Sequence, residues 1–205
     1  MEQSTILYAM ATEAEYGAHL RTRIRPLMTG VGPVEAAVSV TSALSEAATL
    51  GSLPSFMVSL GSAGSARLEH TKVYQASSVS YRDMNAEPLG FSRGVTPFLG
   101  LPAELALPFR IPGLPVARLS TGADIVSGNA YAAVDADMVD MESYAVYRAC
   151  QAFNVPLIVL RGISDGLTPL EGIDSWTRHL DVVDRNLAKA VDLLEAFVLA
   201  HGPCD

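Results

Sequence analysis

The chain has 205 residues, of which 49% are hydrophobic and 18% are charged, and its formal net charge is −8. This composition can bury the core of one domain, expected to span residues 1–205, and it excludes an intrinsically disordered chain. The acidic balance argues against nucleic-acid binding, which needs a basic surplus, and every apolar stretch ends before the roughly 18 residues of a membrane span. We therefore expect neither nucleic acid nor a membrane as a partner.

The first residues, Met1 to Thr5, lack the cationic and long apolar regions of a signal peptide. The two cysteines, Cys150 and Cys204, do not have metal-ligand spacing. The four histidines are scattered along the chain, at His19, His70, His179 and His201. We therefore expect a reduced, cytoplasmic protein that uses neither a metal ion nor an organic cofactor.

Apolar runs of strand length alternate with longer helical patterns, which is typical of an α/β domain. In the first half we expect a strand at residues 5–10, a helix at 34–48, a strand at 56–60 and an extended stretch at 72–81. Residues 87–115 are rich in Pro and Gly, so we expect little regular structure there beyond one turn near residues 103–107. This segment can be a lid, an oligomer contact or a plain connector.

The second half of the chain continues the same alternation. We expect a strand at residues 116–121, a helix at 140–153 and a strand at 157–165. The last helix is predicted to begin near Ser175, with Asp174 or Ser175 as its cap.

Carboxylates stand near the ends of several of these elements. Glu13 follows the first strand, Glu142 lies near the start of a helix, and Asp165 ends the strand at 157–165, while Gly61-Ser62-Ala63-Gly64 follows the strand at 56–60. Alone, each acid could be a helix cap or a first-turn acid, and the glycine segment could be a tight turn. Ligands of open α/β sheets bind beyond the carboxyl ends of strands, and paired acids are the groups that cleave glycosidic bonds.

Six segments in order resemble the 5′-methylthioadenosine/S-adenosylhomocysteine nucleosidases, which belong to the nucleoside phosphorylase/uridine phosphorylase superfamily. The segments are Ala9-Met10-Ala11-Thr12-Glu13, Thr29-Gly30-Val31-Gly32-Pro33-Val34-Glu35-Ala36-Ala37, Gly61-Ser62-Ala63-Gly64, Tyr81-Arg82-Asp83-Met84-Asn85, Val139-Asp140-Met141-Glu142 and Arg161-Gly162-Ile163-Ser164-Asp165. The resemblance implies a three-layer α/β/α fold around a mixed, partly barrel-like sheet, and a homodimer.

The resemblance also implies roles for individual residues. Asp165, positioned by Ser164, would donate a proton to N7 of adenine. Glu142 would hold the ribose hydroxyls, with Met141 under the sugar. Glu13, helped by Ser62, would deprotonate the attacking water. The remaining residues implied at the ligand are Met10, Ile125, Val126, Trp176 and, with second rank, Asp140, which we expect to point away from Glu142 on a shared helix.

The implied activity is hydrolysis of the N-glycosidic bond of a 5′-modified adenine nucleoside, such as 5′-methylthioadenosine, S-adenosylhomocysteine or 5′-deoxyadenosine. A phosphorylase on the same fold and a non-catalytic nucleoside-binding protein are the alternatives. Phosphorolysis needs cationic donors around the phosphate, whereas this sequence places Glu13 there.

Ile125 and Val126 stand where the family often has a stacking Phe, so base selectivity could be looser. Residues 87–115 are shorter than in the family, where they shape the dimer contact and the 5′ pocket. The 5′ substituent therefore stays open.

Overall fold

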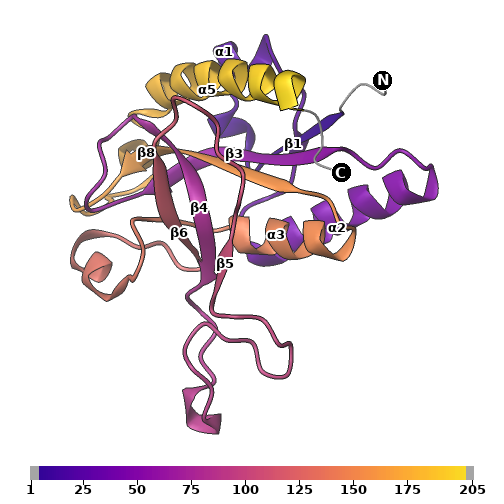
Figure 1. Cartoon of the computed structure of the whole chain (residues 1–205). Helices are drawn as coiled ribbons and strands as arrows, with labels where there is room; N and C mark the ends of the chain where they lie inside the picture. The colour runs from indigo at the N-terminus through magenta and orange to yellow at the C-terminus, as the bar shows by residue number, and fades with distance from the viewer. Residues whose placement is uncertain (1–4, 202–205) are drawn as a thin grey trace.

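The computed structural model describes the backbone of residues 5–201 and the side chains of residues 5–200. Two helices, α1 (Ala18–Arg21) and α5 (Leu180–His201), cover one face of the central sheet, and α2 (Pro33–Thr49) and α3 (Ser143–Ala152) cover the other (Figure 1). The predicted three-layer α/β/α fold with a mixed central sheet is therefore confirmed. Cys204, considered above as a possible ligand, lies outside the described residues.

Within the described residues the sheet has eight strands, in the order β2-β1-β3-β7-β6-β4-β5, with β8 paired to both β3 and β4. The strands are β1 (Ile6–Met10), β2 (Leu27–Met28), β3 (Phe56–Gly64), β4 (Val73–Tyr81), β5 (Glu104–Ala106), β6 (Val116–Thr121), β7 (Met138–Asp140) and β8 (Leu157–Asp165). Because β8 links β3 to β4, the strands β3, β8, β4, β6 and β7 form a closed ring. This ring is the barrel-like part of the sheet.

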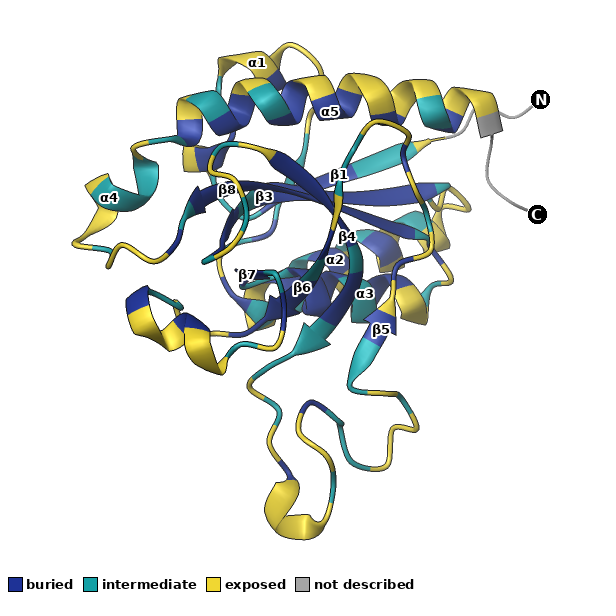
Figure 2. Cartoon of the chain, turned by 60° about the vertical axis from the view of Figure 1, so that its left-hand side comes forward, coloured by how far each residue is buried: buried dark blue, intermediate teal, exposed yellow. Residues whose placement is uncertain are grey.

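The interior consists of two apolar clusters, one on each side of the sheet. Strand β8 serves both, because Leu157 and Val159 belong to the cluster under α2 and α3, while Ile158 and Leu160 belong to the cluster under α5. A strand that is covered on both faces reads as one continuous apolar run, which is why β8 is predicted correctly over its whole length. Figure 2 shows these central strands as the most buried part of the molecule.

Four local predictions differ from the structure. Asp140 ends β7 instead of opening a helix, and α3 begins only at Ser143. Gly61 to Gly64 continue β3 and pair with β8, so they do not form a turn. Residues 104–106 form strand β5, paired antiparallel to β4, where a turn was expected. The last helical region is split into α4 (Ile173–Thr177) and α5. Strands of three residues are too short to show a period in the sequence.

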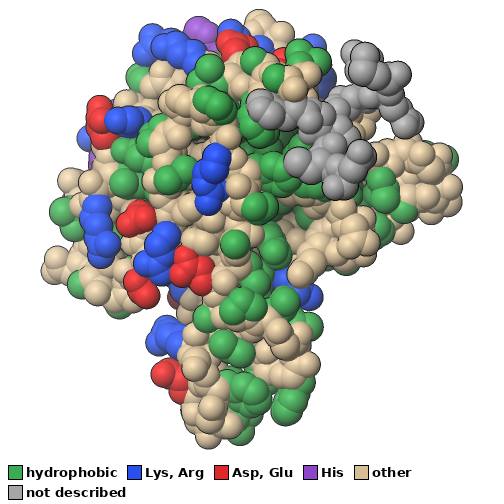
Figure 3. Space-filling view, viewed as in Figure 1, with side chains coloured by type: hydrophobic (Ala, Val, Ile, Leu, Met, Phe, Trp, Pro, Cys, Tyr) green, Lys and Arg blue, Asp and Glu red, His purple; other side chains and the backbone are tan. Residues whose placement is uncertain are grey.

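The segment between β4 and β5 extends away from the body of the protein as an arm, defined here as residues 82–103 (Figures 1 and 3). It contains one 3-10 turn, η2 (Glu87–Leu89), in agreement with the prediction of little regular structure. Three of its large apolar side chains are exposed: Leu89, Phe98 and Leu99. Among the helices in the described part of the chain, none has the length and apolar character to cross a membrane.

Candidate active site

A cavity of about 580 Å³ opens where the carboxyl ends of strands β3, β7 and β8 meet. This is the edge of the sheet at which the sequence places the candidate acids. Of the residues predicted to contact a ligand, those that line it are Ser62, Ile125, Val126, Asp140, Met141, Glu142, Asp165 and Trp176. One cavity therefore collects side chains from segments more than 100 residues apart.

A second, much smaller cavity of about 10 Å³ adjoins the first, since Glu15, Ser62 and Glu142 line both. Met10 and Arg161 are also among the residues that line it. This volume is close to what one buried water molecule needs, and the carboxylates, hydroxyl and guanidinium around it offer a water several polar partners. The small cavity is therefore a suitable place for a single water between two carboxyl groups.

Glu15 occupies the position that the sequence analysis assigned to Glu13. It is buried, and its Oε1 accepts hydrogen bonds from the Ser62 backbone N–H at 2.7 Å and from Ser62 Oγ at 2.5 Å. Both hydrogen bonds from Ser62 end on Oε1, and no group in the described part of the chain donates to Oε2, so this second oxygen is available to a ligand. Burial raises the pKa of Glu15, against the lowering effect of the Ser62 hydrogen bonds.

The expectation that Glu13 lies beside Ser62 is wrong. The carboxylate of Glu13 pairs with Arg21 at 2.5 Å, its side chain is 65% exposed, and it lines neither cavity. Both acids belong to the 3-10 turn η1 (Glu13–Glu15), which Thr12 caps by accepting from the Ala14 N–H. After Met10 the chain makes this turn, so the inward-facing acid comes two residues later than the sequence motif suggests.

Glu142 lies between the two cavities. Its Oε1 accepts a hydrogen bond from the Gly32 N–H at 2.9 Å, next to the first turn of α2. Burial raises the pKa of Glu142 to about 7, and the charge of nearby Asp140 adds to this effect. The group is therefore poised to change charge near neutral pH.

Because the pKa of Glu142 is higher in the folded protein than the usual 4.5, its effect on stability depends on pH. At low pH the protonated Glu142 does not reduce the free energy of unfolding. As the pH rises through about 7 the group ionises in its buried position, and stability is lost. Relative to Glu142→Gln, the wild type is expected to lose on the order of 2 kcal/mol between pH 5 and pH 8, or about 4–8 °C in Tm. Thermal unfolding at both pH values measures this, with Glu46→Gln, an exposed acid on α2, as the control for charge removal. A Tm difference between Glu142→Gln and wild type that is equal at the two pH values would contradict this account.

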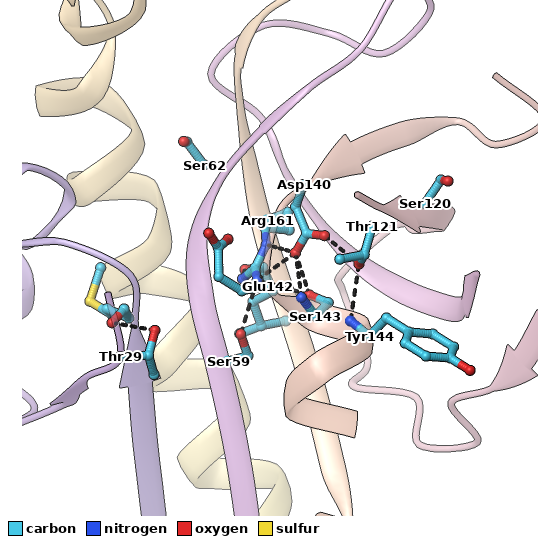
Figure 4. Close-up of polar contacts among 12 residues, drawn as sticks. Thr29, Ser59, Ser62, Ser120, Thr121, Asp140, Glu142, Ser143, Tyr144 and Arg161 are labelled. Carbon is cyan, nitrogen blue, oxygen red and sulfur yellow. Dashed lines mark hydrogen bonds and ion pairs between the residues drawn. The ribbon is translucent and has the colours of Figure 1, made fainter. Parts of the chain in front are cut away.

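Asp140 and Arg161 form a buried ion pair beside Glu142 (Figure 4). Two guanidinium nitrogens of Arg161 donate to Asp140 Oδ2, at 2.8 and 3.1 Å, and Arg161 also donates to Ser59 and Ser143. The other oxygen, Asp140 Oδ1, accepts from Thr121 at 2.6 Å. The expectation that Asp140 points away from Glu142 on a shared helix is wrong, since Asp140 ends β7 and lines the large cavity together with Glu142. Its carboxylate is occupied by the protein, and it acts by fixing its neighbours.

Asp165 is the last residue of β8 and faces the large cavity. The buried Ser164 donates from Oγ to Asp165 Oδ1 at 2.6 Å, which is the pairing that the resemblance implies. Gly64 lies across from it at the end of β3, and Asp165 itself is one of the residues that line the cavity. The carboxyl group can therefore reach a ligand in the cavity.

A family model described as the phosphorylase superfamily matches residues 117–199. The 5′-methylthioadenosine/S-adenosylhomocysteine nucleosidase of Haemophilus influenzae (strain PittGG) is 29% identical over 191 residues, covering 78% of this chain and 80% of the relative. Its counterpart in strain 86-028NP is 31% identical over 161 residues, covering 68% of this chain and 66% of the relative. The chain belongs to the 5′-methylthioadenosine/S-adenosylhomocysteine nucleosidase family.

Among solved structures, a native futalosine hydrolase of Helicobacter pylori superimposes with a TM-score of 0.78 and 19% identity, over 95% of this chain and 98% of the other. At this level of identity the similarity establishes the shared fold.

Besides Glu15, two further residues at this site were given no role from the sequence, Arg82 and Tyr131. Arg82 lines the large cavity and donates to four backbone carbonyls, those of Ser120, Gly122, Asp124 and Asp140. Tyr131 contacts Asp165. Arg82 belongs to a segment that resembles the family, so the sequence could have indicated its place at the site. Tyr131 lies in a part of the chain without any motif, so the sequence could not have indicated it.

Trp176 lies on α4 and lines the large cavity, where its Nε1 donates to Ser62 Oγ at 3.1 Å. Because it is the single Trp of the chain, its fluorescence reports on this site alone. We expect saturating adenine to change the emission on excitation at about 295 nm, since stacking and desolvation alter the surroundings of the indole. Trp176→Phe, which removes the signal, is the control for absorption by adenine. An unchanged spectrum at saturation would place Trp176 outside the ligand's reach.

Proposed function

We propose that this protein hydrolyses the N-glycosidic bond of a 5′-modified adenine nucleoside and releases adenine. The observation that carries the proposal is the convergence of three carboxyl groups, those of Glu15, Glu142 and Asp165, on one cavity of about 580 Å³. Curated relatives of the same family are named 5′-methylthioadenosine/S-adenosylhomocysteine nucleosidases, which supports this choice of substrate class.

Asp165 is proposed as the acid that protonates N7 of the leaving adenine. When the glycosidic bond breaks, negative charge develops on the base and positive charge on the ribose ring. A carboxyl group at the base neutralises the first of these charges, and Ser164 holds that group through Oδ1. The presence of Asp165 in the lining of the large cavity supports this role.

Glu142 is proposed to hold the ribose hydroxyls, with Met141 against the sugar. Both line the large cavity, and the carboxylate of Glu142 also lines the small one. An ionised carboxylate beside the ring stabilises the oxocarbenium-like transition state. This position between the two cavities fits a ribose whose C1′ faces the water.

Glu15, in place of Glu13, is proposed as the base that deprotonates the attacking water. A buried carboxyl group with a raised pKa is a stronger base than an exposed one, and Oε2 of Glu15 is available to the water. Ser62 fixes the carboxylate through Oε1, and Arg161 lines the same small cavity. The water would then lie between Glu15 and the sugar held by Glu142.

Hydrolysis is favoured over phosphorolysis because the cations at the site are already engaged. Among the described residues that line the two cavities, the cationic side chains are Arg82 and Arg161. Arg82 donates to backbone carbonyls, and Arg161 donates to Asp140 and to serine hydroxyls. A phosphate needs free guanidinium donors in bidentate geometry, and the buried carboxyl group of Glu15 would repel it.

We further propose a homodimer whose arms, residues 82–103, contact the second copy. The exposed Leu89, Phe98 and Leu99, all on this one arm, support the proposal, since exposed apolar surface is typical of an interaction site. The identity of the 5′ substituent, the single-domain organisation and a cytoplasmic location stay predictions.

A substrate panel tests the proposed function. Adenine release is measured with 5′-methylthioadenosine, S-adenosylhomocysteine, 5′-deoxyadenosine and adenosine, with inosine as the control for base selectivity. We expect release from at least one 5′-modified substrate with a kcat/KM at least about 10-fold above that of adenosine, because an apolar 5′ group adds binding energy. Absence of adenine release from all four adenine nucleosides would refute the proposal.

A further inference from the structure

Tyr131 is the aromatic side chain that contacts the proposed acid. It lies in the 3-10 segment η3 (Gly128–Ala133), is 7% exposed, and places its hydroxyl 3.4 Å from Asp165 Oδ2. Ser164 donates to the opposite oxygen, Oδ1, at 2.6 Å. The carboxyl group of Asp165 is therefore held from both sides, by one hydroxyl on each oxygen.

The end of β3 leaves room for this contact. A Cβ atom on Gly64 would lie 2.0 Å from the Tyr131 hydroxyl oxygen and 2.8 Å from Asp165 Oδ2. Any side chain at position 64 would thus displace the phenol, the carboxyl group or both. Burial, together with the neighbouring Asp165, raises the pKa of Tyr131, so its hydroxyl keeps its proton and remains a donor.

The segment that carries Tyr131 is also attached to the segment that follows Asp165. Ser127 Oγ accepts a hydrogen bond from the Leu170 N–H at 2.9 Å, and an added Cβ on Gly128 would be in van der Waals contact with Pro169, at 3.5 Å. The hydrogen bond between Leu170 and Ser127 therefore links the loop that leads to Tyr131 with the loop that follows Asp165.

We propose that Tyr131 is a positioning residue for Asp165, an inference that rests on the proposed function. When Asp165 passes its proton to N7 of adenine, the carboxylate that remains gains charge on Oδ2. The Tyr131 hydroxyl then donates to a charged oxygen, which is a stronger bond than one to the neutral acid.

The test is Tyr131→Phe, which removes the hydroxyl and keeps the ring. Loss of a hydrogen bond to a charged group is expected to lower kcat by about 10- to 100-fold, with KM changed less than about threefold. The loss of kcat at a retained KM separates this role from a structural one, because a disturbed site would also weaken substrate binding and raise KM.

Tyr8→Phe is the matched control. Tyr8 is 8% exposed and also donates to a carboxylate, Glu195 Oε1 at 2.9 Å, but it lines neither cavity. We expect wild-type kcat and KM for Tyr8→Phe. An active wild type with an unaffected Tyr131→Phe, or with a Tyr131→Phe that raises KM as much as it lowers kcat, would overturn this inference alone. A wild type that releases no adenine would overturn the proposed function, and this inference with it.

Discussion

Replacing Glu15 with glutamine is expected to lower kcat for adenine release by at least about 100-fold, because glutamine cannot accept a proton from water. The substitution keeps the shape of the side chain, and its amide oxygen can still accept from Ser62. The binding of adenine should therefore change little. The loss would appear in kcat, since deprotonation of the water belongs to the transition state and not to substrate binding.

Glu13→Gln is the matched control for this prediction. Glu13 is in the same turn, but its side chain is 65% exposed and paired with Arg21. We expect its kcat to stay within about twofold of the wild type, because an exposed ion pair contributes little. If Glu13→Gln is the inactive variant and Glu15→Gln is active, the assignment of the base to Glu15 is wrong.

Asp165→Asn is expected to reduce kcat by about 10²- to 10⁴-fold, the range typical for loss of a general acid. Asparagine can still hydrogen-bond to the amine of adenine, so binding should persist, which the fluorescence of Trp176 can report. Asp192→Asn, at an exposed carboxylate paired with Arg23, is the control. A variant that retains full activity would exclude Asp165 as the acid. Equal inactivity of wild type and variant, with adenine still bound, would indicate a binding protein without catalysis.

The sequence was sufficient to predict the layers of the fold and the positions of Asp165 and Glu142. Strand β8 is predicted because both of its faces are buried, so its apolar run is continuous and ends at a polar pair, Ser164 and Asp165. Such information is local, and a sequence displays it directly. The same holds for the stripe of buried residues along α5.

The choice between Glu13 and Glu15 could not be made locally. Both acids follow β1, and the direction each one takes depends on how the next residues are anchored. The carboxylate of Asp184, on α5, accepts from the N–H groups of Gly17, His19 and Leu20 and so fixes the chain just beyond the turn. This contact joins residues more than 160 positions apart, and no motif near Glu13 or Glu15 in the sequence indicates it.

The orientation of Asp140 was predicted wrongly and the role of Tyr131 was not predicted, for related reasons. Strand β7 has only three residues and is held in place by its pairing with β6 and β3. A strand this short shows no pattern of its own in the sequence, so the helix that follows it was predicted to begin too early. Tyr131 reaches Asp165 from 34 positions away in the chain, out of a segment with no periodic pattern. Tertiary contacts decide such positions, and single-sequence patterns do not contain them.

The most direct test of the central claim is product analysis with and without phosphate. Wild-type protein is incubated with 5′-methylthioadenosine in phosphate-free buffer and in buffer with about 50 mM phosphate, and the products are identified by mass spectrometry. The account predicts free adenine and free 5-methylthioribose in both buffers, at equal rates. Cleavage that requires phosphate and yields the sugar 1-phosphate would contradict it.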